Sequence, residues 1–169
     1  MKNVTIDLEE LSTSALLEIA RCSTDKDVLQ AIYEIGIEKN DKVFFLELAI
    51  NRSPAIKEIL EEIGQNKALL TELRKITIAN SGFASNPYTP YYLLEICLQE
   101  NILSDALYNP NTPARALNKC FPELLKYKRY ICEKVVKENG EKLSDEVLKM
   151  IIETYPDFLL PKQILAERK

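Results

Sequence analysis

The stretch Asn86-Pro87-Tyr88-Thr89-Pro90 decides the fold, because it recurs as Asn109-Pro110-Asn111-Thr112-Pro113 in this 169-residue chain. A proline restrains the residue before it to extended conformations, so the first proline of each block is expected to end the preceding helix. The second proline suits the first position of a new helix, where its missing N–H is not needed. The threonine before it has a hydroxyl that can accept a free N–H of the first turn. Each block is therefore predicted to end one helix and start the next.

The two blocks also predict a repeat, since 23 residues separate Asn86 from Asn109. Apolar residues follow both blocks at the same helical spacing: Leu93, Leu94 and Cys97 after the first, and Ala116, Leu117 and Cys120 after the second. A period of this length is typical of stacked helical repeats. The clearest repeats are expected at 86–121, with weaker copies at 22–35, where Thr24 would cap the helix, and at 51–63, where Ser53 would.

The Asn-Pro-x-Thr-Pro blocks, each followed by a leucine-bearing helix, resemble the variant leucine-rich repeat family (LRV-like). That family forms an α-solenoid of short stacked helices with a right-handed superhelix. The resemblance covers 86–121 well and 51–63 partly, whereas longer helices expected at 122–139 and 144–154 are more similar to HEAT or armadillo hairpins. It implies an all-α binding scaffold. It implies no cofactor, because the clustered cysteines of the iron–sulfur members are missing here.

The rest of the chain is predicted to be helical, in a single helical-repeat domain over 1–169 whose residues 122–169 form C-terminal capping helices. No segment shows the strict alternation of a half-buried strand. Ser12 or Thr13 is expected to start one early helix, and Asn40 or Asp41 the helix 42–50.

Two further boundaries follow from glycine and from small polar residues. Gly64 is expected to end the helix that begins after Pro54, because glycine suits the left-handed position after a helix. The segment Asn80–Ser85 is expected to be a loop, with Phe83 anchored in the core.

Composition argues against an enzyme. The chain has no histidine, which removes the usual general base near neutral pH and the commonest zinc ligand. Its four glycines form no phosphate-binding loop, and its four cysteines form no CxxC pair. The N-terminus lacks an apolar signal region and no apolar run reaches membrane length, so we expect a cytoplasmic protein with reduced thiols, no metal and no membrane partner.

Tyrosines mark the predicted partner-binding surface. Tyr88, Tyr91, Tyr92 and Tyr108 are half of the eight tyrosines in the chain, and all lie at or beside expected helix starts. Tyrosine is enriched at protein interfaces because it offers a large contact area at a small entropic cost. Tyr88, Tyr91 and Tyr108 are therefore the candidate contacts of a non-catalytic protein–protein interaction scaffold, whose partner is another protein.

The alternative is a nucleic-acid-binding helical-repeat module that uses a mild basic patch near 126–137. Lys126, Lys128 and Arg129 alternate with tyrosines there, as expected where a protein contacts phosphates and bases. Four-residue pairing of Arg129 with Glu133 instead predicts an ordinary solvated helix face. The formal net charge of −4 also makes nucleic acid an unlikely main partner, since affinity for phosphates needs concentrated positive charge.

Overall fold

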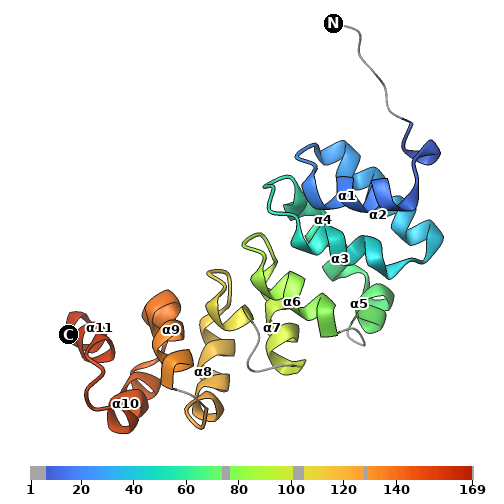
Figure 1. The fold of residues 1–169 in the computed structure, drawn as a ribbon. Helices are drawn as coiled ribbons and strands as arrows, with labels where there is room; N and C mark the ends of the chain where they lie inside the picture. The colour runs from blue at the N-terminus through green and yellow to red at the C-terminus, as the bar shows by residue number, and fades with distance from the viewer. Residues whose placement is uncertain (1–6, 74–76, 101–104, 128, 169) are drawn as a thin grey trace, which may run out of the picture. The chain divides into compact units, whose positions relative to one another are not determined.

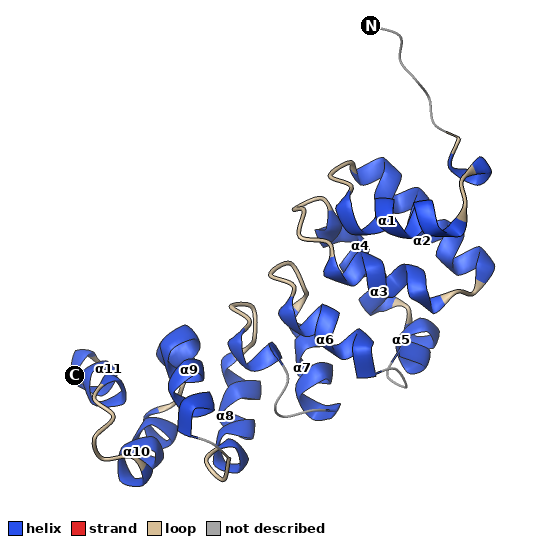
Figure 2. Cartoon of the chain, in the orientation of Figure 1, coloured by secondary structure: helices blue, strands red, loops and turns tan. Residues whose placement is uncertain are grey.

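The computed structural model describes residues 7–73, 77–100, 105–127 and 129–168, and these residues form helices and connecting loops without a strand (Figure 2). The all-α class is thus confirmed. The chain divides into two compact units, Met1–Gly82 and Phe83–Lys169, and each of them buries its own set of apolar side chains. The single domain over 1–169 stays a prediction.

The first unit runs from blue to green in Figure 1. Its helices bury phenylalanine and aliphatic side chains. Its elements are η1 (Leu8–Glu10), α1 (Thr13–Cys22), α2 (Lys26–Lys39), α3 (Lys42–Ile50), α4 (Ile56–Gln65), α5 (Lys67–Leu73) and the start of α6 (Thr77–Ser85). Helix α3 contacts α1, α2 and α4, and it buries Phe44 and Phe45 fully. The Tyr33 ring meets Phe45 edge-on at a centroid distance of 5.8 Å. Helix α3 is therefore the central helix of this unit.

Side-chain caps mark the starts of α1, α2 and α3, whereas the predicted cap Ser53 is wrong, because α4 starts after Ala55 without a side-chain cap. Ser12 accepts from the Ala15 N–H and Asp41 from the Val43 N–H, as predicted. The predicted cap Thr24 is wrong, because Asp25 caps α2 and accepts from the N–H groups of Asp27 and Val28 at 2.9 and 3.3 Å. Its carboxylate reaches two free N–H groups and also carries the charge that the start of a helix favours.

The predicted helix end at Gly64 is also wrong. Gly64 is buried within α4, which continues to Gln65. The following residue, Asn66, has an extended backbone, and its side chain accepts from the Leu69 N–H at 3.0 Å to start α5. The left-handed conformation occurs in the described chain at Asn40, which ends α2.

The second unit arranges its helices in two rows, of which the first holds the two helices that follow the repeat blocks and one later helix. These are α7 (Tyr91–Glu100), α8 (Ala114–Leu124) and α10 (Asp145–Thr154), and α8 contacts both of the others. The other row holds η2 (Asp105–Tyr108), α9 (Arg129–Asn139) and α11 (Leu160–Glu167), and α9 contacts both of the others. We name these the α8 row and the α9 row. A short turn, η3 (Gly140–Lys142), leads from α9 toward α10.

Two segments of this part of the chain differ from prediction. Asn80–Ser85 is the end of α6, not a loop, and Gly82 permits its close approach to α3, since a Cβ at Gly82 would lie 3.2 Å from the Ala49 Cβ. Phe83 is buried, as expected. The helix predicted over 122–139 is broken, since α8 ends at Leu124 and the chain turns back into α9, which buries Cys132 with its thiol 3.7 Å from the Leu124 carbonyl oxygen.

Buried asparagines join successive loops of the second unit, and we call Asn109 and Asn139 the asparagine ladder. The Asn109 side-chain amide donates to the carbonyl oxygens of Ala84 and Asn86, at 2.9 and 2.7 Å. The Asn139 amide donates in the same way to Leu107 and Asn109, at 2.8 and 3.4 Å. Each asparagine thus bonds two carbonyls of the loop that precedes it in the chain. The second carbonyl of each pair, that of Asn86 or Asn109, also accepts from the N–H of Thr89 or Thr112.

The amide oxygens of the block asparagines shape their own loops. Asn86 accepts from the Tyr88 N–H and Asn109 from the Asn111 N–H, both at 2.9 Å. Asn139 is followed by Gly140 in place of proline, and its amide oxygen, although buried, accepts no hydrogen bond from the described residues. The proline blocks therefore give the asparagine a tight turn in which both ends of its amide are used.

The block threonines do not cap the following helices, which corrects the prediction. Thr89 and Thr112 are fully buried, and their hydroxyls donate backward to the carbonyl oxygens of Phe83 and Ala106. Because the preceding helix ends there, its last carbonyl groups need donors. The hydroxyl satisfies the end of one helix and leaves the start of the next to proline, which lacks an N–H.

A second line of donors bonds the outer carbonyls of the same loops. Asn111 donates to the carbonyl oxygens of Pro87 and Thr89. One loop later, Lys142 donates to those of Pro110 and Thr112, and its partial burial lowers the pKa of its ammonium group. Arg168, just beyond α11, donates to the carbonyls of Leu143 and Glu141. Three successive loops are therefore bonded in the same manner by three different residue types.

Asn51 has the corresponding role in the first unit. It is buried, its amide donates to the carbonyl oxygens of Ala20 and Ser23 at 2.8 and 2.9 Å, and its oxygen accepts from the Ser53 N–H at 2.7 Å. The expected copy at 51–63 thus shares its loop bonding with the blocks of the second unit.

Asn109→Ala should cost about 2–3 kcal/mol of unfolding free energy, because it leaves the buried Ala84 carbonyl without its side-chain donor and the Asn86 carbonyl with the Thr89 N–H alone. Asn111→Ala is the matched control in the same loop. Its side chain is exposed, so water can replace it and the loss should stay near 1 kcal/mol. Urea unfolding measures the free energy of unfolding of both variants. Equal losses of stability would show that the buried asparagine ladder stabilises the fold no more than the exposed Asn111 does.

Thr112→Val should destabilise the protein more than Thr112→Ser does. Valine keeps the shape but removes the hydroxyl donor to Ala106, at a cost of about 1–3 kcal/mol, whereas serine keeps the donor and loses only a methyl group, at about 0.8 kcal/mol. Thermal unfolding of the two variants gives the order. A more stable valine variant would contradict the backward hydrogen bond.

Candidate functional site

Tyr91 is the most exposed of the predicted tyrosines, with 55% of its surface accessible at the start of α7. Its ring meets Tyr92 edge-on at 5.6 Å, and the Arg115 guanidinium carbon lies 6.0 Å from its centroid. Tyr91 is therefore held at its base by a neighbouring ring and a cation while its outer surface faces solvent.

An ion pair beside Tyr91 links α7 to α8. Arg115 donates to both oxygens of Glu95, with Nε–Oε1 and Nη2–Oε2 distances of 2.5 and 3.0 Å. This two-point geometry fixes the planes of the two groups relative to each other. The Arg115 side chain is 72% exposed, so the pair orients the surface more than it stabilises the fold.

A groove of about 520 Å³ lies between these two helices, and we call it the α7–α8 groove. Its lining combines apolar, polar and charged groups: Glu95, Leu98, Gln99, Arg115, Ala116, Lys119 and Cys120. Burial raises the pKa of the Cys120 thiol and the Lys119 ammonium opposes that effect, so a neutral thiol faces the groove at pH 7. Lys119 itself is exposed and forms no ion pair with a described residue.

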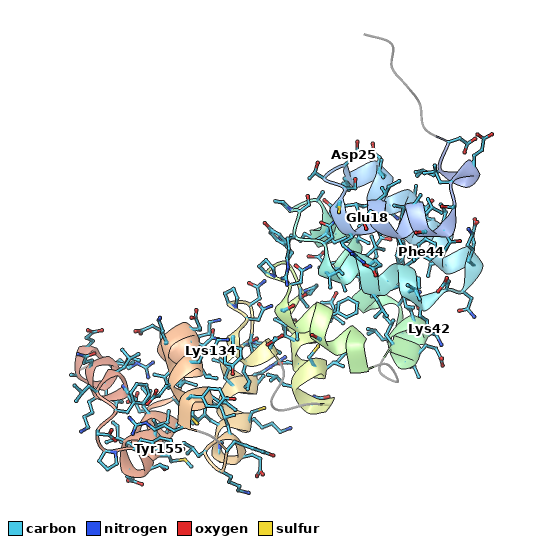
Figure 3. The ribbon with its side chains drawn as sticks, in the orientation of Figure 1. Glu18, Asp25, Lys42, Phe44, Lys134 and Tyr155 are labelled. Atoms are coloured by element: carbon cyan, nitrogen blue, oxygen red, sulfur yellow. The ribbon has the colours of Figure 1, made fainter. Side chains whose placement is uncertain are left out.

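Tyr108 lies in the other row, half-buried on η2. Lys134 extends from α9 (Figure 3). Its Nζ sits 3.8 Å from the centre of the Tyr108 ring, a cation–π contact that stabilises by about 1 kcal/mol. Burial raises the pKa of the Tyr108 phenol. Pro87, Pro110 and Asp105 complete a recess of about 290 Å³ around this pair. Lys134 thus covers one face of the ring.

The three predicted tyrosines come from three different segments of the second unit. Tyr91 belongs to the α8 row and Tyr108 to the α9 row, while Tyr88 is half-buried in the loop before α7. The structure instead places Tyr91 beside the α7–α8 groove, whose polar residues were not predicted. A signal for them exists in the sequence: Tyr91, Glu95 and Gln99, and likewise Arg115 and Lys119, recur every four residues and so share a helix face.

The basic residues of the alternative site are engaged within the chain. Lys126 pairs with Glu123, and Arg129 pairs with both Glu133 and Asp157. The Arg129 guanidinium carbon also lies 5.5 Å from the centre of the Tyr155 ring. Tyr155 itself follows α10 (Figure 3). The third residue, Lys128, lies outside the described residues. Arg129 therefore already has two carboxylates where a phosphate would bind.

No family model, curated protein or solved structure matches this chain. Within the described residues, none of the helices is long and apolar enough to cross a membrane, and no three cysteine, aspartate or glutamate side chains gather as metal ligands. The candidate site consequently depends on the geometry of the α7–α8 groove alone.

Arg129→Met should raise the pKa of Asp157, because the hydrogen bonds from Arg129 are the main cause that holds that pKa below its ordinary value. A depressed pKa in the folded state means that the pair stabilises the protein above the ordinary aspartate pKa of about 3.9 and loses this effect as pH falls. The stability difference between the wild type and the variant should therefore shrink on acidification.

An NMR titration of the Asp157 carboxyl carbon measures this change. Lys126→Met is the control, since it removes a nearby positive charge that pairs with Glu123 and not with Asp157. An unchanged Asp157 pKa in Arg129→Met would show that the ion pair does not form in solution.

Proposed function

We propose that this chain is a non-catalytic, cytoplasmic helical-repeat scaffold that binds another protein through the α7–α8 groove. The single observation that carries the proposal is the groove itself, about 520 Å³ between two neighbouring helices, with an apolar floor and charged walls. The architecture proposed with it is an α-solenoid of variant leucine-rich repeat or HEAT/armadillo type, with the right-handed superhelix that the resemblance implies.

The composition of the groove fits a protein ligand. Interfaces combine an apolar centre with a polar rim and are enriched in tyrosine and arginine. Here Leu98 and Ala116 form the apolar part, Arg115 and Gln99 the rim, and Tyr91 stands exposed at one end. The α7–α8 pair thus presents an apolar centre, a polar rim and an exposed tyrosine, which are the groups that protein interfaces use.

Rigid support of the two helices strengthens this proposal. Helix α7 starts directly after the loop of Asn86 and α8 after the loop of Asn109, and Asn109 bonds one loop to the other. The Arg115–Glu95 pair joins the helices on the groove side. The loop hydrogen bond and the surface ion pair both fix the two helices that form the groove. A groove with fixed walls loses less conformational entropy when it binds a segment.

The nucleic-acid alternative has weaker support. Arg129 and Lys126 pair with carboxylates that would have to be displaced, and Glu133 and Asp157 would repel a phosphate. Charge on the whole chain, at −4, also opposes a polyanion. A ligand in the α7–α8 groove would not have to displace these ion pairs.

Ala116→Arg should abolish partner capture, because its long side chain would occupy the groove that Ala116 lines. Ala114→Arg is the matched control, since it adds the same group on an exposed position of the same helix. The test compares proteins retained from lysate by the immobilised wild type and by each variant, after circular dichroism has confirmed that all three fold. Equal retention by wild type and Ala116→Arg would remove the groove from the proposal.

A further inference from the structure

We infer that the segment bound in the α7–α8 groove is an acidic amphipathic peptide, with one side-chain carboxylate that meets Lys119 and an apolar side chain that packs on Leu98 and Ala116. This inference rests on the proposed function and specifies the chemistry of the partner.

Charge in the groove lining is uneven in a way that selects the ligand. Glu95 and Arg115 satisfy each other through two hydrogen bonds, so neither needs an external partner. Lys119 is the remaining lining cation, and it has no carboxylate among the described residues. An anionic group brought by the ligand would complete this wall, whereas a basic ligand would be repelled by Lys119 and Arg115 together.

A single carboxylate fits the lining better than a phosphate does. Two cations and one carboxylate line the groove, which leaves one formal positive charge. A phosphate group carries about two negative charges near pH 7 and would meet the Glu95 carboxylate on the opposite wall. A glutamate or aspartate side chain matches the one unpaired ammonium group without that conflict.

The floor of the groove calls for an apolar neighbour beside the acid. Leu98 is 4% exposed, Ala116 lies half-buried across from it, and the Cys120 thiol is neutral. These groups offer no charge and little hydrogen bonding to a ligand, so apolar contact is the favourable way to cover them. From Tyr91 to Gln99 the α7 wall measures roughly 12 Å, enough for two helical turns of a ligand.

Peptide display tests the inference directly. A random library of peptides about 12 residues long, the length of three helical turns, is selected on the immobilised full chain and depleted on Ala116→Arg, so that groove binders remain. The enriched peptides should place aspartate or glutamate three or four residues from leucine, isoleucine or phenylalanine, because those positions share a helix face.

The affinity of one enriched synthetic peptide for point variants of the chain then measures what the Lys119 charge contributes to binding. By fluorescence polarisation, Lys119→Glu should weaken binding about tenfold, since a like charge replaces the complementary one. Lys57→Glu, which changes an exposed lysine of the first unit, should leave the affinity unchanged. A peptide whose acid is replaced by lysine should bind Lys119→Glu more tightly than it binds the wild type.

The outcomes distinguish the inference from the proposed function. Enriched peptides without an acidic residue, tighter binding of a phosphopeptide, or an affinity that Lys119→Glu does not change would overturn the acidic ligand while the groove kept its role. A selection in which Ala116→Arg retains the same peptides as the wild type would overturn both.

Discussion

The second unit depends on buried side-chain amides that bond the backbone of neighbouring loops. Tight turns between short helices bury carbonyl groups that no helix can satisfy, and each such group is costly when it lacks a donor. Asn109 and Asn139 each supply two donors to the preceding loop. A hydrophobic side chain of the same size would fill the space but leave the Ala84 and Leu107 carbonyls without these donors, whereas those of Asn86 and Asn109 would keep the N–H groups of Thr89 and Thr112.

This constraint also positions the candidate site. The loops that the asparagines join are those from which α7 and α8 start, and the groove lies between these helices. Threonine hydroxyls close the preceding helices from inside, while Asn111, Lys142 and Arg168 bond the outer carbonyls. The chain itself thus bonds most polar groups inside these loops, the Asn139 amide oxygen being the exception among the described residues, and the side chains left for a ligand are those on the helix faces.

The caps Ser12 and Asp41 were predictable because their oxygens reach N–H groups two or three residues away. A local pattern did not decide between neighbouring caps, since Asp25 caps α2 in place of Thr24. Asn80–Ser85 has loop-like residues but is helical, with Gly82 close to α3, and Thr112 has the position of a cap but donates backward to Ala106. The groove was missed because its walls come from two helices whose pairing no local pattern states.

The sequence by itself determined that this protein is all-helical and that Asn-Pro-x-Thr-Pro blocks stop and start its helices, because proline restricts its neighbours whatever surrounds them. Only the tertiary structure decided what the polar residues of those blocks do and which exposed side chains face a common groove. Asn109 can bond Asn86, and Arg115 can bond Glu95, only after folding brings their helices together. A hydrogen bond needs its two atoms about 3 Å apart in space, however far apart their residues lie in the sequence. Local sequence patterns therefore do not reveal these pairs.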